Sequence, residues 1–572
     1  MSSLVPFKPD QVESEIHANG FLGFVSKLTL SAYKDEKVIE AIAVAASKRN
    51  RLVNDDDHSV LSRLEGSKFF EVQSILCEVI PLLETEPTEL IELVQALVDH
   101  GGADLAANQP NVAFRQWCEA DLGRADDVLQ LAKDGNEQAQ SYLVFALQAK
   151  GDFEEAIECI ARTEEERTAG VLALSRMQLD EVQVSISLKK VIALALVEDI
   201  KTSCGITRAA YDIATKSHNV ERDELLPLLD KLFASEDPVV VHLAASLLNW
   251  HQRAMNGAET NKCLEKIATV DAKNKGTIDE IDMALTKLIE SGEVRAASFA
   301  AHAIVKRSKG AIDVDSLDSF FHKLTNGSSA QLAQLTLDWL SLGSFFPCAV
   351  LNGAISEINQ TEPAFPVSEI PLPKTANEQI FLCRKAIGYL FTHPMTAAAF
   401  SVAVLMRGHD DAKQHMAELL FDPLLLSYSG ALKDWLEAFA KDHEISRPSI
   451  EEALRRAQVV WDDCQGAREV VELEPSENAR ALVYFQKMEE YERTRDESGR
   501  RSIFADLFTT QHLLYGDRSA FNIMTSADSL EQKIMPFSEI SISSELPKGI
   551  FVDPIGLDMM LDQFRHERMI SQ

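Results

Sequence analysis

The stretch DELLPLLDKLFASEDPVVVHLAASLLNW, residues 223–250, decides the fold. Its first half places an apolar residue every three or four positions: Leu225, Leu228, Leu229 and Leu232. Because an α-helix turns once in about 3.6 residues, this spacing puts the four side chains on one face. Asp237-Pro238 can then start a second helix, since proline fits a first helical turn. The same periodicity continues through Val240, Leu243, Ala244 and Leu247, so the stretch predicts two helices joined by a short turn.

Two later segments have the same outline, IDMALTKLIESGEVRAASFAAHAIV (281–305) and LDSFFHKLTNGSSAQLAQLTLDWL (317–340). The first unit resembles a HEAT-type repeat, and Val294-Arg295 in the second matches the Val-Arg step that is usual in that family. Val241 departs from the pattern because it stands where the arginine is expected, and an insertion lies near residues 251–276. The resemblance implies paired helices that stack on their neighbours.

A second kind of repetition lies upstream. LGRADDVLQLA (122–132) is echoed by AKGDFEEAIECI (149–160), so that Gly123 and Gly151 lie 28 positions apart. A weaker third copy runs through residues 171–182. Each clear copy has a glycine followed by a small acidic helix start and an apolar stripe, which predicts further helical pairs between about 112 and 183.

The second of these copies resembles the turn between the two helices of a tetratricopeptide repeat. The resemblance assigns the turn to Gly151-Asp152, packing on the previous helix to Phe153, and close helix contact to the small Ala156. Two departures put it in question. Val144 stands where the family usually has a small residue, and no helix-ending proline follows near Thr168.

Helical periodicity extends over most of the chain, including Val38–Ala46, Pro87–Val98, Met283–Ile289 and Ala431–Ala440. Strand-like alternation is nearly absent before Ser538–Ser543. A pair of helices cannot bury both of its apolar faces alone, so pairs stack on one another. We therefore expect an all-α fold: an α-solenoid of stacked helical hairpins with a C-terminal helical domain. A generic helical array related to neither family is the alternative.

The chain divides by composition into six segments. These are an N-terminal helical region (1–110), tetratricopeptide-like helical repeats (111–200), HEAT-like repeats (201–360), a proline-rich linker (361–376), a C-terminal helical domain (377–530) and an extended tail (531–572). The C-terminal domain includes a highly charged helix, Asn478–Arg501. The tail has apolar anchors between turn-forming residues. We expect it to dock on the body, because exposed segments this apolar are uncommon, and a partner-binding tail is the alternative.

The charge balance is strongly acidic: 89 acidic against 56 basic residues give a formal net charge of −33. Such a surface repels phosphate backbones, which disfavours nucleic-acid binding through the overall surface and leaves a local basic groove as an alternative. The basic clusters are short pairs: Lys189-Lys190, Lys306-Arg307, Arg455-Arg456 and Arg500-Arg501. The acidity favours protein partners with basic surfaces.

Eight cysteines occur singly, without CxxC spacing, which predicts reduced, buried thiols in the cytoplasm and no disulfide frame or zinc site. The N-terminus lacks the basic start and apolar run of a signal peptide. Residues 386–406 carry no formal charge, but Gly388 and Pro394 interrupt them. Two packed helices that meet at Pro394 explain this stretch better than a membrane span.

Motifs of the common enzyme classes are absent: no P-loop, strand-led GxGxxG, HExxH or GxSxG occurs. We expect no cofactor and no metal. His409 and His415 lie six apart, whereas metal ligands on one helical face lie four apart, so a charged loop explains them better. The Asp313-Val314-Asp315 run with Asp318 lacks the further donors and the glycine of a calcium loop, and indicates an acidic helix start.

Arg51 and His58 are the catalytic candidates that remain. Their spacing loosely resembles the Arg-x4–6-His pairing of HEPN ribonucleases. In that family arginine stabilises developing phosphate charge while histidine moves a proton, and the resemblance implies these roles here. Against it, Asn54 and three aspartates immediately precede His58, which is typical of a loop that caps the next helix and disfavours bound RNA.

Three function classes follow. The first is a non-catalytic scaffold or adaptor, because stacked helix pairs create long binding surfaces. A large repeat chain without an enzyme motif would suit an accessory subunit of a multi-protein bacterial system, such as one directed against phage. The second is an enzyme, with the HEPN-like ribonuclease as its named form. The third is a nucleic-acid-binding module or an acidic DNA mimic.

Overall fold

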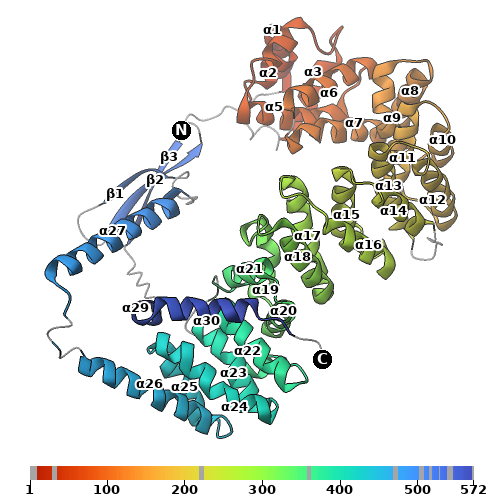
Figure 1. The fold of residues 1–572 in the computed structure, drawn as a ribbon. Helices are drawn as coiled ribbons and strands as arrows, with labels where there is room; N and C mark the ends of the chain where they lie inside the picture. Colours follow the sequence, from red (N-terminus) through yellow and green to blue (C-terminus); the bar gives the residue numbers. More distant parts are fainter. Residues whose placement is uncertain are drawn as a thin grey trace. The chain divides into compact units, whose positions relative to one another are not determined.

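The computed structural model describes residues 9–28, 35–102, 104–217, 224–356, 358, 362–467, 470, 474–500, 508–513, 518–526, 529–536 and 545–569. Helices make up nearly all of the regular structure in these ranges, which confirms the all-α prediction (Figure 1). The chain forms two compact units, residues 1–320 and 321–572. This division falls inside the segment 201–360 that the sequence groups together. None of the helices among the described residues is both long and apolar enough to cross a lipid bilayer.

The first third of unit 1 consists of short helices that pack on alternate neighbours. They are α1 (Pro9–Asn19), α2 (Phe21–Val25), α3 (Glu36–Ser47), α4 (Asp55–Leu61), α5 (Gly66–Val79), the 3-10 turn η2 (Ile80–Leu82), α6 (Pro87–Gly101), η3 (Leu105–Asn108) and α7 (Gln109–Ala120). Helix α6 begins at Pro87, as predicted, and Gly102 ends it with a φ of 62°. The positive φ explains why glycine stands there, since other residues adopt it at a cost.

The region of the tetratricopeptide-like pattern is helical throughout. It contains α8 (Leu122–Lys133), α9 (Glu137–Lys150), α10 (Phe153–Cys159), α11 (Glu164–Arg176), α12 (Glu181–Ala195) and α13 (Ile200–Ala214). Gly151 ends α9 in the left-handed conformation, and the Asp152 carboxylate accepts a hydrogen bond from the Glu155 N–H to cap α10. A Cβ on Gly170 would lie 2.6 Å from the carbonyl oxygen of Ala156. Helices α10 and α11 therefore touch backbone to backbone at the small residue that the sequence indicated.

The decisive stretch 223–250 forms two helices in the described part, α14 (Leu225–Phe233) and α15 (Pro238–Trp250), and Asp237 caps the second by accepting from the Val239 N–H. The presumed insertion is mostly helix: η4 (Gln252–Ala254) is followed by α16 (Gly257–Ile267). Then come α17 (Lys275–Glu290), α18 (Val294–Ser308), η5 (Asp315–Leu317) and α19 (Asp318–Thr325). The buried Asp282 of α17 accepts from the N–H groups of Ser319 and Phe320 at 3.1 and 2.8 Å. Burial raises the pKa of this carboxyl even though these bonds favour its charged form.

Alternate helices of unit 1 contact one another in two rows. Helices α7, α9, α11, α13, α15 and α17 each touch the next member of the row, and so do α12, α14, α16 and α18. Consecutive helices such as α8 and α9, or α12 and α13, pack between the rows. Each helical pair thus buries its apolar faces on the pairs before and after it, as the periodicity requires.

Unit 2 contains one helix, α23, whose middle eleven residues are all buried. Its helices are α20 (Ser329–Leu342), α21 (Phe345–Ser356), η6 (Val367–Glu369), α22 (Ala376–Leu390), α23 (Pro394–Arg407), α24 (Asp410–Leu419), the π-type turn η7 (Leu420–Leu425), α25 (Ala431–Asp442), α26 (Arg447–Ala467) and α27 (Glu477–Arg500). Helices α22 and α23 confirm the two helices that meet at Pro394. Every residue of α23 from Met395 to Leu405 is buried.

The proline-rich segment 361–376 is a packed strap rather than a free linker between domains. Within its described residues, Phe365 and Ile370 are buried, and the Phe365 ring lies edge-on to Phe400 of α23 at 5.8 Å. The Arg407 guanidinium at the end of α23 donates to the carbonyl oxygens of Val367 and Ile370 at 2.8 and 2.9 Å. The segment lies inside unit 2 because its apolar side chains complete the cover of α23.

The sequence predicted helices up to residue 530, and this is wrong for the last part. An antiparallel sheet is formed by β1 (Phe508–Leu513), β2 (Arg518–Ser526) and β3 (Ser529–Pro536), in the order β1-β2-β3. The strand-like Ser538–Ser543 lies outside the described residues. The tail 531–572 is not merely extended either: it includes α29 (Gly549–Val552) and α30 (Pro554–His566).

Candidate functional site

The structure brings the two catalytic candidates of the sequence together on one carboxylate. Arg51 Nη2 lies 3.1 Å and His58 Nε2 lies 3.2 Å from Oε1 of Glu92 on α6. Burial opposes ionisation of Glu92, but the hydrogen bonds from His58 and Arg51 outweigh it and lower the pKa of Glu92. A carboxylate therefore bridges the two side chains.

The acidic run before His58 caps a helix, as predicted. Asn54 and Asp57 form a reciprocal capping box at the start of α4. The Asp57 side chain, only 1% exposed, also accepts from the Arg49 guanidinium at 2.8 Å and from the Leu22 N–H at 2.8 Å. This carboxylate ties α4 to α2 and to Arg49, which follows α3, so the cluster around His58 has an evident structural role.

The other sequence candidates belong to helices or to the turns that start them. The sequence favoured a charged loop for His409 and His415, and this is wrong: His409 caps α24 by accepting from the Asp411 N–H through Nδ1, and His415 lies within that helix. Asp313 accepts from the N–H and the hydroxyl of Ser316 at 3.1 and 2.7 Å. In the part of the chain that the structure describes, no three His, Cys, Asp or Glu side chains converge in a way that could hold a metal ion.

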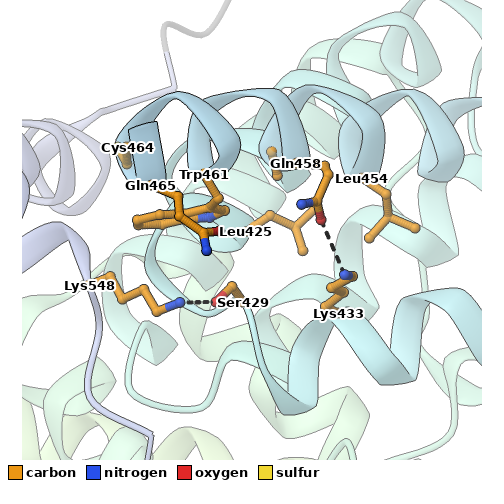
Figure 2. A pocket seen from close by; sticks show the side chains of 10 residues that line it. Leu425, Ser429, Lys433, Leu454, Gln458, Trp461, Cys464, Gln465 and Lys548 are labelled. Atoms are coloured by element: carbon orange, nitrogen blue, oxygen red, sulfur yellow. Dashed lines mark hydrogen bonds between the residues drawn. The ribbon is translucent and has the colours of Figure 1, made fainter. Parts of the chain in front are cut away.

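A pocket of about 330 Å³ opens in unit 2 between α25, α26 and the C-terminal segment (Figure 2). Its lining residues are Leu425, Ser429, Lys433, Leu454, Ala457, Gln458, Trp461, Cys464, Gln465 and Lys548. The Lys548 ammonium lies 4.5 Å from the centre of the Trp461 ring and donates to the Ser429 hydroxyl. On the opposite side, Lys433 donates to the Gln458 side-chain oxygen at 3.4 Å. Two ammonium groups beside an aromatic floor could hold a small anionic molecule, since both are donors with positive charge.

The pocket depends on a contact between segments far apart in the sequence. The Glu545 carboxylate accepts from the N–H groups of Gly430 and Ala431, at 2.8 and 3.2 Å, at the start of α25. A helix start offers unpaired N–H groups and a partial positive charge, which suits a carboxylate. The Lys548 N–H then donates to the Ser427 carbonyl at 2.8 Å. These bonds place the Lys548 side chain in the wall of the pocket.

The C-terminal helix α30 docks on α22, as the sequence predicted for the tail. Its inner face buries Leu557, Leu561 and Phe564. The Arg565 guanidinium donates to the Gly388 carbonyl at 2.6 Å, and the buried Lys385 ammonium donates to the Arg565 carbonyl at 2.5 Å. Burial lowers the pKa of Lys385. The docked helix therefore gives the buried Lys385 ammonium a hydrogen-bond acceptor and also covers apolar surface.

The same C-terminal segment also leaves large apolar side chains exposed, one of which, Phe551, lies 5.0 Å from the Lys487 ammonium of α27. Six large side chains on it are between 48% and 72% exposed: Leu546, Ile550, Phe551, Val552, Ile555 and Met559. We call this set the C-terminal face. Along α30, Asp558 and Asp562 share the helical side of Ile555 and Met559, because positions three and four apart are neighbours. The C-terminal face thus combines apolar side chains with carboxylates.

Sequence reasoning missed the pocket and the C-terminal face as functional features. The pocket unites α25, α26 and Lys548, and no spacing pattern links Lys548 to Trp461 across more than eighty residues. The sequence did hold a signal for the C-terminal face: residues 546–559 contain more large apolar side chains than one docked face can bury. A scan against protein-family models found no matching family, and a search of curated proteins found no match.

Proposed function

We propose that this chain is a non-catalytic scaffold or adaptor that binds protein partners within a multi-protein complex. The observation that carries the proposal is the C-terminal face. Monomeric proteins rarely leave contiguous large apolar side chains in water, and such patches mark interaction sites when polar residues surround them. The docked position of α30 holds this face in a fixed orientation, which reduces the entropy lost on binding.

The partner that fits this face has an apolar groove with basic side chains at its rim. Ile555 and Met559 would enter the groove, and Asp558 and Asp562 would meet the rim charges. The net charge of −33 supports the same choice, because it speeds the approach of basic proteins. The two rows of helices in unit 1 support a solenoid with further binding surface.

The proposed setting is the cytoplasm. All eight cysteines are free and none forms a disulfide, which fits a reducing compartment. A role as accessory subunit in a bacterial anti-phage system is one form of the proposal, and it rests on the general character of the chain rather than on particular residues.

A HEPN-like ribonuclease is the second candidate function. It is favoured by the convergence of Arg51 and His58, which the sequence alone could not guarantee. The shared Glu92 weighs against it, because RNA would have to displace a carboxylate that both side chains already bind.

Partner capture tests the scaffold proposal. The full chain is compared with the double variant Ile555→Asp/Met559→Asp in extract of cells that express it, with captured proteins quantified by mass spectrometry. Val182→Asp is the matched control, because Val182 is 68% exposed on α12 in unit 1. We expect a discrete set of proteins with the wild type and the control, weaker at high salt and at least about tenfold depleted with the double variant. An identical set with all three chains would refute the role of this face.

A further inference from the structure

Helix α27 carries an apolar stripe that the molecule leaves uncovered. Tyr484, Phe485, Met488 and Tyr491 recur at helical spacing and are 62%, 68%, 40% and 65% exposed. None of the 24 residues of α27 is buried. Most of the stability of helices in proteins comes from packing an apolar face rather than from helix propensity. The exposed stripe therefore calls for a partner surface.

The spacing of the stripe is that of a coiled coil. Ala481, Tyr484, Met488 and Tyr491 occupy successive a and d positions of a heptad repeat, which form the seam between two supercoiled helices. Arg495 at the next a position ends the apolar part of the seam. The apolar seam therefore runs from Ala481 to Tyr491, or 11 of the 24 residues of α27.

The residues beside the seam select the partner. In this register Lys487 falls at a g position and Glu492 at the following e position. In a parallel pair of identical helices, g of one chain faces the following e of the other, so Lys487 meets Glu492 of the second copy twice per dimer. Arg480, the preceding g residue, meets the aromatic Phe485 in the same way, which suits a cation–π contact. An antiparallel pair would place g beside g and e beside e, and would lose both complementary contacts.

We propose that α27 pairs with α27 of a second copy of this chain to form a parallel coiled-coil dimer. The second copy is favoured over an unrelated partner because the two flanks of the stripe complement each other, with basic residues on one side and an acidic residue on the other. The dimer carries two C-terminal faces and so makes the scaffold bivalent, but the pairing itself does not rest on the proposed function.

Charge exchange across the seam tests the pairing in the full chain. Lys487→Glu places two carboxylates opposite each other, and Glu492→Lys places two ammonium groups opposite each other. Each like-charged contact should weaken the homodimer, by about five- to thirty-fold for the two pairs together. A mixture of the two variants restores both Lys–Glu contacts and should form a heterodimer. The double variant Lys487→Glu/Glu492→Lys should form a homodimer like the wild type.

Sedimentation equilibrium over a range of about 1 to 100 μM measures the association, since dimerisation depends on concentration. Met488→Glu puts a charge in the seam and should leave a monomer, and circular dichroism of the same variant shows whether the rest of the chain is folded. A wild-type monomer over the whole range would overturn the proposal, as would two single variants that associate as well as the wild type. Lys487 also lies 5.0 Å from the ring of Phe551, so a monomer whose α27 amides are protected from exchange would mean that the C-terminal face covers the stripe instead.

Discussion

Gly388 offers the sharpest test of the docked C-terminal helix. A Cβ at this position would lie 3.0 Å from Cβ of Phe564 and 3.1 Å from the backbone nitrogen of Arg565. A backbone nitrogen cannot move aside as a flexible side chain can, so Gly388→Ala overpacks the contact between α22 and α30. Overpacking of this kind costs about 1 to 3 kcal/mol. Alanine also favours the helical state of α22 by about 1 kcal/mol, but this gain is present whether α30 is docked or not.

The docking equilibrium of α30 therefore responds to the clash alone. A loss of about 1 to 3 kcal/mol raises the fraction of undocked helix by roughly 5- to 150-fold. Hydrogen exchange followed by mass spectrometry measures this as faster exchange in peptides covering α30, provided that opening is in equilibrium. Gly205→Ala on α13 is the matched control, because nothing lies within 4 Å of its added Cβ. Wild-type exchange of α30 in Gly388→Ala would refute the contact.

Three further predictions concern titration, catalysis and thiol chemistry. Burial, together with the nearby charge of Lys306, lowers the pKa of His302 from 6.5 to about 4. The unfolded state therefore binds the proton at a higher pH than the folded state does, and the free energy of unfolding falls as the pH drops from about 6.5 to about 4. Urea unfolding at pH 7 and pH 5 should show a loss of about 2 kcal/mol that His302→Gln does not show. The purified chain should leave single-stranded RNA intact; cleavage that disappears in both Arg51→Ala and His58→Ala would establish the ribonuclease instead. Cys464 alone of the eight cysteines, all within the described part, is exposed and should be alkylated first. The rate of Cys464 alkylation by iodoacetate relative to iodoacetamide, measured by peptide mass spectrometry, should be roughly two- to threefold higher than for a free thiol, because the pocket cations attract the anionic reagent. The variant Lys548→Gln should remove this preference.

Helices could be predicted from the sequence because their signal is local. The leucines of 225–232 and the proline at 238 define α14 and α15 through spacings of three and four residues, and the structure has both helices at those places. The helix within 251–276 was missed because Cys263, Leu264 and Ile267 give only a narrow stripe among polar residues. Periodicity detects an apolar face only where that face is wide enough to stand out.

The sheet was missed for a different reason. Strands β1, β2 and β3 contain several polar residues, and their side chains alternate only weakly between apolar and polar. The turn signal Gly516-Asp517 between two short runs was present in the sequence and indicates a hairpin. The pocket, and the place at which the tail docks, could not be predicted, because both depend on which surfaces meet in space. Glu545 and Gly430 are more than a hundred residues apart.

The burial of α23 from Met395 to Leu405 has an evolutionary consequence. Between Met395 and Leu405, α23 offers no exposed position at which a substitution goes unnoticed, whereas every residue of α27 is exposed. Across related chains, the sequence should therefore change most slowly between Met395 and Leu405. A substitution in this segment should be accompanied by a compensating substitution in the strap around Phe365, which contacts it. Distant relatives of this protein are best sought by comparing that short buried segment. Exposed helices can vary freely in sequence, whereas close packing restricts the side-chain volumes that the buried segment can accept.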